Sequence, residues 1–187
     1  MAVEMRQRTF TVEEYEQLGR VGIIGEDERV ELIEGQIVEM NPIGNDHIWR
    51  VNELNLIFAR RGDVMVSVQN PLRLQRSEPE PDLVVLRADV PRDRPPTPED
   101  TLLVVEVADS SLGYDRGTKA PLYARAGVPE LWIVDLGGER IEAHQDPSPA
   151  GYRTVRLFVR GERLAPLFAP DLSIEIDAIL GPPAASG

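Results

Sequence analysis

The chain of 187 residues is 42% hydrophobic and 28% charged, which is typical of a globular domain with a substantial core and unlike a disordered tract. Its formal net charge of -12 counts against a protein that coats nucleic acid, because such binding needs concentrated Lys and Arg. A local basic groove, or a metal ion held by carboxylates, is still compatible with that charge. No apolar run approaches the roughly 20 residues of a membrane span, no signal peptide is evident and there is no cysteine, so we expect no membrane contact, no disulfide and a cytoplasmic protein.

The first elements in the chain are a short helix and a hairpin. Residues 9–18 predict a helix because Thr11 can act as N-cap and Glu14, three residues later, completes a capping box. Residues 29–40 predict a β-hairpin that turns at Glu34 and Gly35, since glycine tolerates the positive φ of such turns.

The strongest helical pattern spans residues 45–62. Asn45 or Asp46 is the expected cap, and Arg60, Arg61 and Gly62 mark the expected end. The apolar stripe that would face the core consists of Val51, Leu54 and Phe58.

The remaining chain reads mainly as strands, expected over residues 64–69, 71–75, 82–86, 101–108 and 130–135, followed by a hairpin over 139–145 and 151–159. Residues 87–100, rich in proline and charge, predict a surface loop. A second helix is expected around residues 118–128, with Thr118 as N-cap and Pro121 in its first turn. The chain therefore predicts one α/β (α+β) domain over residues 1–187, with a mixed sheet and a tail that frays from about residue 181.

Glu106 interrupts the apolar strand of residues 101–108. Strands that are apolar throughout are usually covered on both faces, so this carboxylate is expected close to the core. A buried carboxylate must be protonated, paired or bound to a metal ion. The alternatives are a salt bridge to an arginine or a strand end that reaches solvent.

Asp82 opens the strand of residues 82–86 and would be held at its rim. If this strand neighbours that of Glu106, two carboxylates converge at one edge, as Mg²⁺ prefers when water and substrate phosphate complete its shell. The simpler interpretation is that Pro81 and Asp82 only mark a turn. Glu78 and Glu80, just before them, are expected to be solvated loop residues.

Two more charged residues are candidates only in combination with these. Glu31 lies between Val30 and Leu32 in the first hairpin, where alternation favours a solvent-facing side chain. Lys119 begins the predicted second helix, close in sequence to the end of the Glu106 strand, and would add to an anion-attracting helix start. If Lys119 is considered alone, a solvated helix residue is the favoured interpretation.

Other chemistry finds little support. There is no P-loop, no GxGxxG and no nucleophile elbow. His47 and His144 lack metal-ligand spacing, and His47 is expected to be a capping or surface residue. Trp49 and Trp132 are expected in the core or an interface rather than as base-stacking platforms.

Four segments together resemble the Uma-type putative restriction endonuclease family of the PD-(D/E)xK nuclease superfamily: RVELIEGQIVEMNP, PDLVVL, LLVVEVADSSLGYDRGTK and LYARAGVPELWIVD. The resemblance runs from about Phe10 to about Ile176, and YARAGVPELWIVD is its most specific stretch. It implies a restriction-endonuclease-like core, with a mixed central sheet flanked by helices and additional hairpins.

Carried over by position, Asp82 matches the aspartate of the PD motif and Glu106 the acidic residue of the next motif strand. Glu31 matches the family's N-terminal glutamate, and Lys119 a lysine on the following helix. Two positions after Glu106 stands Ala108 where the superfamily pattern has lysine, so Lys119 would replace it from the helix. Gln69, ahead of the PD motif, would border the site.

The resemblance implies a Mg²⁺- or Mn²⁺-dependent endonuclease that hydrolyses DNA. Asp82 and Glu106 would hold the metal, with Glu31 in support or holding a second ion. Lys119 would orient the attacking water, help to deprotonate it, or stabilise charge on the phosphate. A homodimer is plausible because cleaving a duplex needs two cuts. The alternatives are a catalytically inactive binding or assembly module of the same fold and, less favoured, a hydrolase of RNA or nucleotides.

Overall fold

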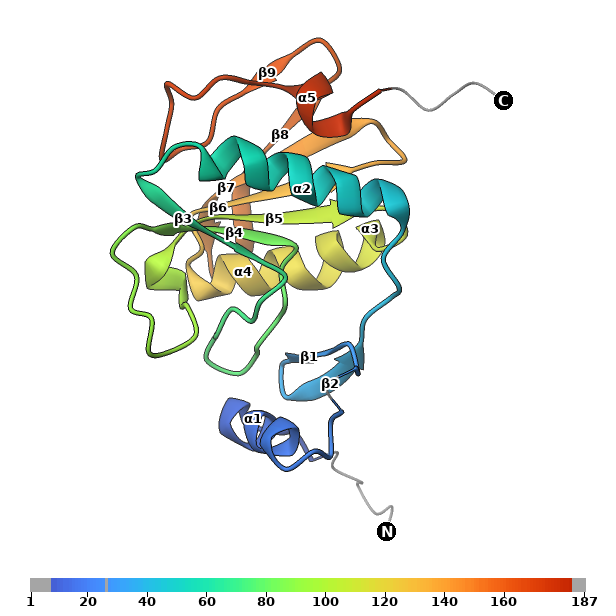
Figure 1. Cartoon of the computed structure of the whole chain (residues 1–187), viewed down its shortest axis with the longest axis vertical. Helices are drawn as coiled ribbons and strands as arrows, with labels where there is room; N and C mark the ends of the chain where they lie inside the picture. Colours follow the sequence, from blue (N-terminus) through green and yellow to red (C-terminus); the bar gives the residue numbers. More distant parts are fainter. Residues whose placement is uncertain (1–7, 26, 183–187) are drawn as a thin grey trace.

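The computed structural model describes residues 8–25 and 27–182 and is built around a six-stranded mixed sheet with helices on both faces (Figure 1). The strand order is β3-β4-β5-β6-β7-β8, and every neighbouring pair is antiparallel except β5 and β6, which are parallel. The strands are β3 (Val64–Val68), β4 (Leu83–Arg87), β5 (Thr101–Ala108), β6 (Glu130–Asp135), β7 (Arg140–Ser148) and β8 (Gly151–Val159). The α/β fold class expected from the sequence is confirmed.

The N-terminal helix and hairpin lie at one end of the molecule (Figure 1). Helix α1 (Val12–Arg20) begins with the predicted capping box of Thr11 and Glu14. Strands β1 (Val30–Ile33) and β2 (Gln36–Glu39) form the predicted hairpin. At its turn, Gly35 has a φ of +81°, and a Cβ there would lie 2.6 Å from the Cβ of Thr9, so both the backbone conformation and the space require glycine.

Helix α2 (Asn45–Ala59) covers one face of the sheet together with α5 (Ile176–Leu180). The predicted stripe is buried, and the Phe58 ring lies 5.9 Å from the ring of Trp132 in β6, measured between centroids. The predicted cap was wrong: Gly44 occupies the N-cap position and contributes no side-chain hydrogen bond. Trp132 is fully buried as expected, whereas Trp49 is largely exposed.

The opposite face of the sheet is covered by a helical segment that starts earlier than predicted. It consists of α3 (Leu112–Tyr114), a π-helical turn over Asp115–Lys119 and α4 (Ala120–Ala126). Thr118 is therefore inside the helix and not its N-cap. Pro121 has no N–H to donate to the carbonyl four residues before it, and the wider π turn accommodates that loss. Lys119 consequently does not lie at a helix start.

Two other segments differ in detail from expectation. Residues 71–75 form no strand; Leu72 and Leu74 are buried, and their N–H groups donate to Pro79 and Ser77 within a compact loop. The predicted surface loop of residues 87–100 ends in a 3₁₀ turn (Pro98–Asp100). The short strands β9 (Arg163–Leu164) and β10 (Ile174–Glu175) precede α5, and most of the tail expected to fray lies outside the described residues.

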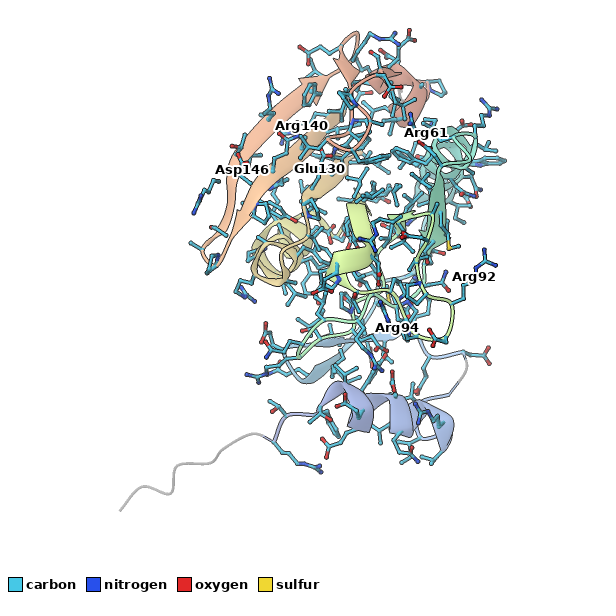
Figure 2. All side chains as sticks on the ribbon, turned by 90° about the vertical axis from the view of Figure 1, so that its left-hand side faces the viewer. Arg61, Arg92, Arg94, Glu130, Arg140 and Asp146 are labelled. Atoms are coloured by element: carbon cyan, nitrogen blue, oxygen red, sulfur yellow. The ribbon has the colours of Figure 1, made fainter. Side chains whose placement is uncertain are left out.

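Glu130 at the start of β6 shows that a buried carboxylate here can be purely structural (Figure 2). It accepts hydrogen bonds from the Trp132 indole at 3.0 Å, the Gln145 amide at 2.8 Å and the Leu167 N–H at 2.7 Å. These donors satisfy its charge and connect the sheet to the C-terminal segment.

Among the described residues, no helix is long and apolar enough to cross a membrane.

The contact between α2 and the sheet gives a stability prediction. Phe58 is completely buried, so Phe58→Ala is expected to lower the free energy of unfolding by about 3–5 kcal/mol through lost contacts and a residual cavity. Leu56→Ala, half-exposed on the same helix, is the matched control and should change it by about 0.5 kcal/mol or less. Urea unfolding followed by tryptophan fluorescence measures both, and equal losses in the two variants would contradict this packing.

Candidate active site

Asp82 and Glu106 meet because β4 and β5 are antiparallel neighbours. Leu83 pairs with Val105, which brings Asp82 beside the C-terminal half of β5, where Glu106 stands. The backbone N–H of Val107 donates to Asp82 Oδ2 at 2.8 Å. This hydrogen bond holds the Asp82 carboxylate at the rim of the sheet, in a position fixed by backbone rather than by a flexible loop.

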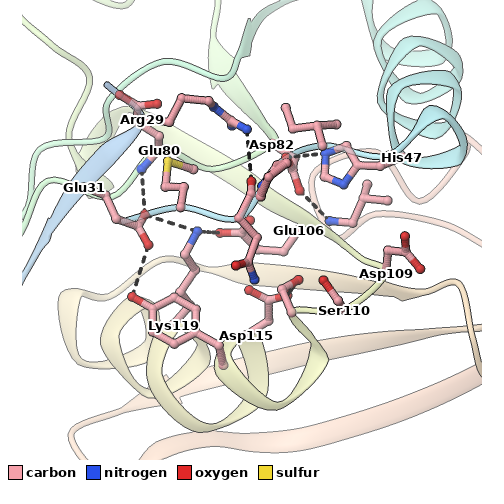
Figure 3. A pocket seen from close by; sticks show the side chains of 18 of the residues that line it. Arg29, Glu31, His47, Glu80, Asp82, Glu106, Asp109, Ser110, Asp115 and Lys119 are labelled. Atoms are coloured by element: carbon pink, nitrogen blue, oxygen red, sulfur yellow. Dashed lines mark hydrogen bonds and ion pairs between the residues drawn. The ribbon is translucent and has the colours of Figure 1, made fainter. Parts of the chain in front are cut away.

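Lys119 reaches the same place from the π turn (Figure 3). Its Nζ lies 3.2 Å from Glu106 Oε1 and 3.3 Å from Glu31 Oε2. The Glu106 side chain points to the face covered by α4, where the Tyr123 hydroxyl donates to the same Oε1 at 2.7 Å. Lys119 is the only lysine in the chain, which otherwise uses arginine for its basic side chains. The site therefore contains a compact ammonium group, and the planar guanidinium of an arginine would not be equivalent to it.

Glu31 completes this ion pair from the hairpin. The expectation that it faces solvent was wrong, because its exposed fraction is 2%. The reason is a bridge between Leu32 and Glu78, which packs the chain leading to β4 against β1. As a result, the Glu80 N–H donates to Glu31 Oε2 at 3.2 Å, and the Tyr114 hydroxyl donates to Oε1 at 3.1 Å.

His47 is a site residue that sequence reasoning missed. It lies in the first turn of α2, and its Nε2 is 2.7 Å from Asp82 Oδ1, so it is neither a cap nor an exposed residue. A signal was present in the spacing, since His47 precedes the buried Val51 by four positions and extends the apolar stripe by one turn. A polar residue on the buried face of a helix needs a partner, and here the partner is Asp82.

These residues line one cavity of about 270 Å³ (Figure 3). Its wall carries seven carboxylates: Glu31, Glu39, Glu80, Asp82, Glu106, Asp109 and Asp115. The cationic side chains on that wall are Arg29 and Lys119. Glu80 therefore belongs to the cavity and Glu78 is buried, which corrects the expectation that both are solvated. Gln69 does not line the cavity; its side chain is exposed and its N–H donates to the Asp82 carbonyl.

The surplus of carboxylates changes the protonation of the site. Burial raises the pKa of Glu106 well above its ordinary value; Lys119 opposes this shift, and the neighbouring Asp82 adds to it. Burial also raises the pKa values of Asp115 and Glu80. Burial alone would lower the pKa of Lys119, but Glu106 and Glu31 raise it above its ordinary value, so this side chain is a permanent cation at neutral pH.

The donor set suits a hard divalent cation of the Mg²⁺ type. Within residues 8–25 and 27–182, no group of three or more His, Asp or Glu side chains is arranged to hold a metal ion. Mg²⁺ commonly takes only one or two carboxylates and fills its shell with water and substrate oxygens. Asp82 and Glu106 line the same cavity and could supply such a pair, and the Glu106 contacts to Lys119 and Tyr123 both use Oε1. A bound cation would favour the ionised form of the cavity carboxyl groups, whose pKa values are raised by burial, and would displace protons from them.

Comparison with known proteins identifies the family and the fold of this chain. The family model Uma2, described as putative restriction endonuclease, matches residues 12–177. No curated protein matches. A crystal structure titled as a putative nuclease belonging to DUF820 from Anabaena variabilis ATCC 29413 is similar in fold, with a TM-score of 0.70 and 15% identity, over 91% of this chain and 97% of that chain.

The raised pKa of Glu106 gives a pH prediction for the metal-free protein. The folded state keeps a proton on Glu106 that the unfolded state releases above its ordinary pKa of about 4.5, so this residue makes the free energy of unfolding fall as pH rises. Glu106→Gln removes that dependence. Urea unfolding of both proteins between about pH 5 and pH 8 should show a stability difference, wild type minus variant, that declines with pH. Parallel curves would contradict the shift.

Proposed function

Because the chain belongs to the Uma2 family, described as putative restriction endonucleases, we propose that it is a Mg²⁺- or Mn²⁺-dependent endonuclease that hydrolyses phosphodiester bonds in DNA. The observation that carries this proposal is the Lys119 ammonium within 3.3 Å of both Glu31 and Glu106, in the cavity that also contains Asp82. A cation, an acidic pair and a recess for substrate are the parts that phosphodiester hydrolysis requires.

Asp82 and Glu106 are the proposed metal ligands, with Glu31 in support. A bound divalent cation would polarise the scissile phosphodiester and lower the pKa of a bound water. The residues of the chain prepare that position in advance: the Val107 N–H and His47 fix the Asp82 carboxylate, and Tyr123 fixes Glu106. Preorganised ligands lose little freedom when the substrate arrives.

Lys119 is proposed to stabilise negative charge on the non-bridging phosphate oxygens. Its raised pKa argues for this role over that of a base, since it keeps its proton at neutral pH. Water adds to phosphorus, the bond to one bridging oxygen breaks, and the released oxygen takes up a proton. The products are one strand end with a phosphate and another with a hydroxyl.

We further propose that the chain acts as a single domain, since Glu31 of the N-terminal hairpin contacts Lys119 in the sheet-covering helix. A homodimer would allow both strands of a duplex to be cut. The alternative of an inactive binding or assembly module came from the acidic surface and the lack of an evident base-reading motif. Because alanine stands at position 108, where lysine is usual, catalysis depends on Lys119 reaching the site. The contact between Lys119 and Glu106 favours the enzyme, because it supplies the missing ammonium from another element.

Substitution at the two centres tests the activity. Asp82→Ala and Lys119→Met should each reduce cleavage of DNA by about 10²–10³-fold in Mg²⁺ or Mn²⁺, as expected when one charge-stabilising group is removed. Lys119→Arg should reduce cleavage to a similar extent, because the guanidinium differs in shape from the ammonium that it replaces. The matched control is His144→Gln, which lies in β7 outside the cavity and should retain activity. Equal cleavage by all variants would indicate a contaminating nuclease.

The His47 contact can be tested through metal binding. Removing a hydrogen-bonding partner of a ligating carboxylate typically costs about 10–100-fold in metal affinity or activity. His47→Ala should therefore weaken Mn²⁺ binding by that factor in titration calorimetry without DNA, because Asp82 Oδ1 loses its contact. His144→Gln again serves as the histidine control. Unchanged Mn²⁺ affinity in His47→Ala would show that His47 does not orient Asp82.

A further inference from the structure

The reacting groups of the proposed site are recessed beneath the protein surface. The exposed fractions are 2% for Glu31, 3% for Glu106, 5% for Lys119 and 8% for Asp82. The Lys119 ammonium is also held by two carboxylates, so it does not extend outward. A phosphodiester must enter the cavity to reach these groups.

The cavity has the size of a site for a small ligand. Its volume of about 270 Å³ is close to the lower end of the roughly 300–1,000 Å³ of ligand pockets. Part of its wall is apolar and comes from Val38 in β2 and from Met40 and Ile43 in the segment between β2 and α2. These side chains are half-buried and line the same cavity as the charged residues that would act on phosphate. An apolar wall beside a phosphate site suits a sugar and base.

Charge disfavours a duplex at the same opening. Among the described residues that line the cavity, seven carboxylates stand against two cationic side chains, Arg29 and Lys119. Duplex DNA carries one phosphate charge per roughly 1.7 Å of axis, about twice the density of either strand alone. A single strand therefore brings less charge to this acidic opening. It also avoids the unstacking and unpairing cost, on the order of a few kcal/mol, of extruding one nucleotide from a duplex.

We propose that the substrate is unpaired DNA: a single strand, or an unpaired segment within a duplex. One nucleotide enters the cavity, its sugar and base lie against Val38, Met40 and Ile43, and its phosphodiester reaches Lys119. Intact duplex is a poorer ligand because it has the higher charge density and because a nucleotide must first be extruded from it. This inference rests on the proposed nuclease function and names the substrate class of that same site.

Binding without cleavage provides the first test. Fluorescence anisotropy in Ca²⁺ compares a labelled single strand, the same sequence as a duplex, and a duplex with a central unpaired bubble. The single strand and the bubble should bind at least about tenfold more tightly than the duplex, in line with the cost of extruding a base. Equal or tighter binding of the duplex would overturn the inference. It would also be overturned if none of the three DNA molecules bound.

A variant of the apolar wall tests where the strand lies. Met40→Asp places a carboxylate on that wall and should weaken single-strand binding by about tenfold or more, by repulsion and by loss of apolar contact. Leu167→Asp is the matched control: Leu167 is 52% exposed and lies outside the cavity, so binding should not change. Urea unfolding verifies that both variants are folded. Unchanged binding in Met40→Asp would remove the wall from the substrate site.

Hydrolysis of a small diester separates this inference from the proposed function. Bis(p-nitrophenyl) phosphate has no strand to pair and reports only on the chemistry. Its Mn²⁺-dependent hydrolysis, lost in Lys119→Met, together with equal cleavage of single-stranded and duplex DNA, would retain the nuclease and reject the substrate class. Tight single-strand binding without any hydrolysis would retain the substrate class and reject the nuclease.

Discussion

The candidate site depends on the Lys119 ammonium held between Glu31 and Glu106. Each of the three groups comes from a different element: the hairpin, the central strand β5 and the π turn. Buried charges are costly unless they are paired, so removing any one of them leaves the others uncompensated. The ion pair therefore couples the placement of the N-terminal hairpin to the integrity of the site.

The position of this ion pair follows from the sheet topology. Strands β5 and β6 are the parallel pair, and the chain that connects them leaves the C-terminal end of β5 as the helical segment with the π turn. The carboxyl ends of parallel strands are where α/β proteins commonly bind ligands, because the connecting segments diverge there. The antiparallel neighbour β4 adds Asp82 at the same edge. A mixed sheet thus supplies carboxylates from strands of opposite direction.

Much of the fold was predictable from local patterns. Strands β5 and β6 have the predicted ends, and the stripe of α2 and the hairpin turn at Gly35 agree with the structure. These features depend on periodicity and glycine conformation, which are local properties of the chain. Asp82 and Glu106 were identifiable because an acid at the mouth of an apolar strand needs an explanation, and the family resemblance supported that choice.

The parts that were missed depend on contacts between distant segments. The burial of Glu31 requires the bridge from Leu32 to Glu78, which no hairpin pattern reveals. His47 was misjudged because its partner lies 35 residues away. The π turn was not predicted because Pro121 is equally compatible with the start of a helix. Only the long helical segment that begins at Leu112 shows that the helix does not start there.

The sole lysine of the chain has a consequence beyond the site. Lys119 is 5% exposed, and the other basic side chains are arginines, whose guanidinium groups do not react as amines. Acylating reagents, amine cross-linkers and enzymes that attach groups to lysine thus find no accessible lysine side chain on this protein. Modifications that neutralise lysine therefore leave the surface charge of this protein unchanged. A reagent that modifies the Lys119 side chain must first gain access to the cavity.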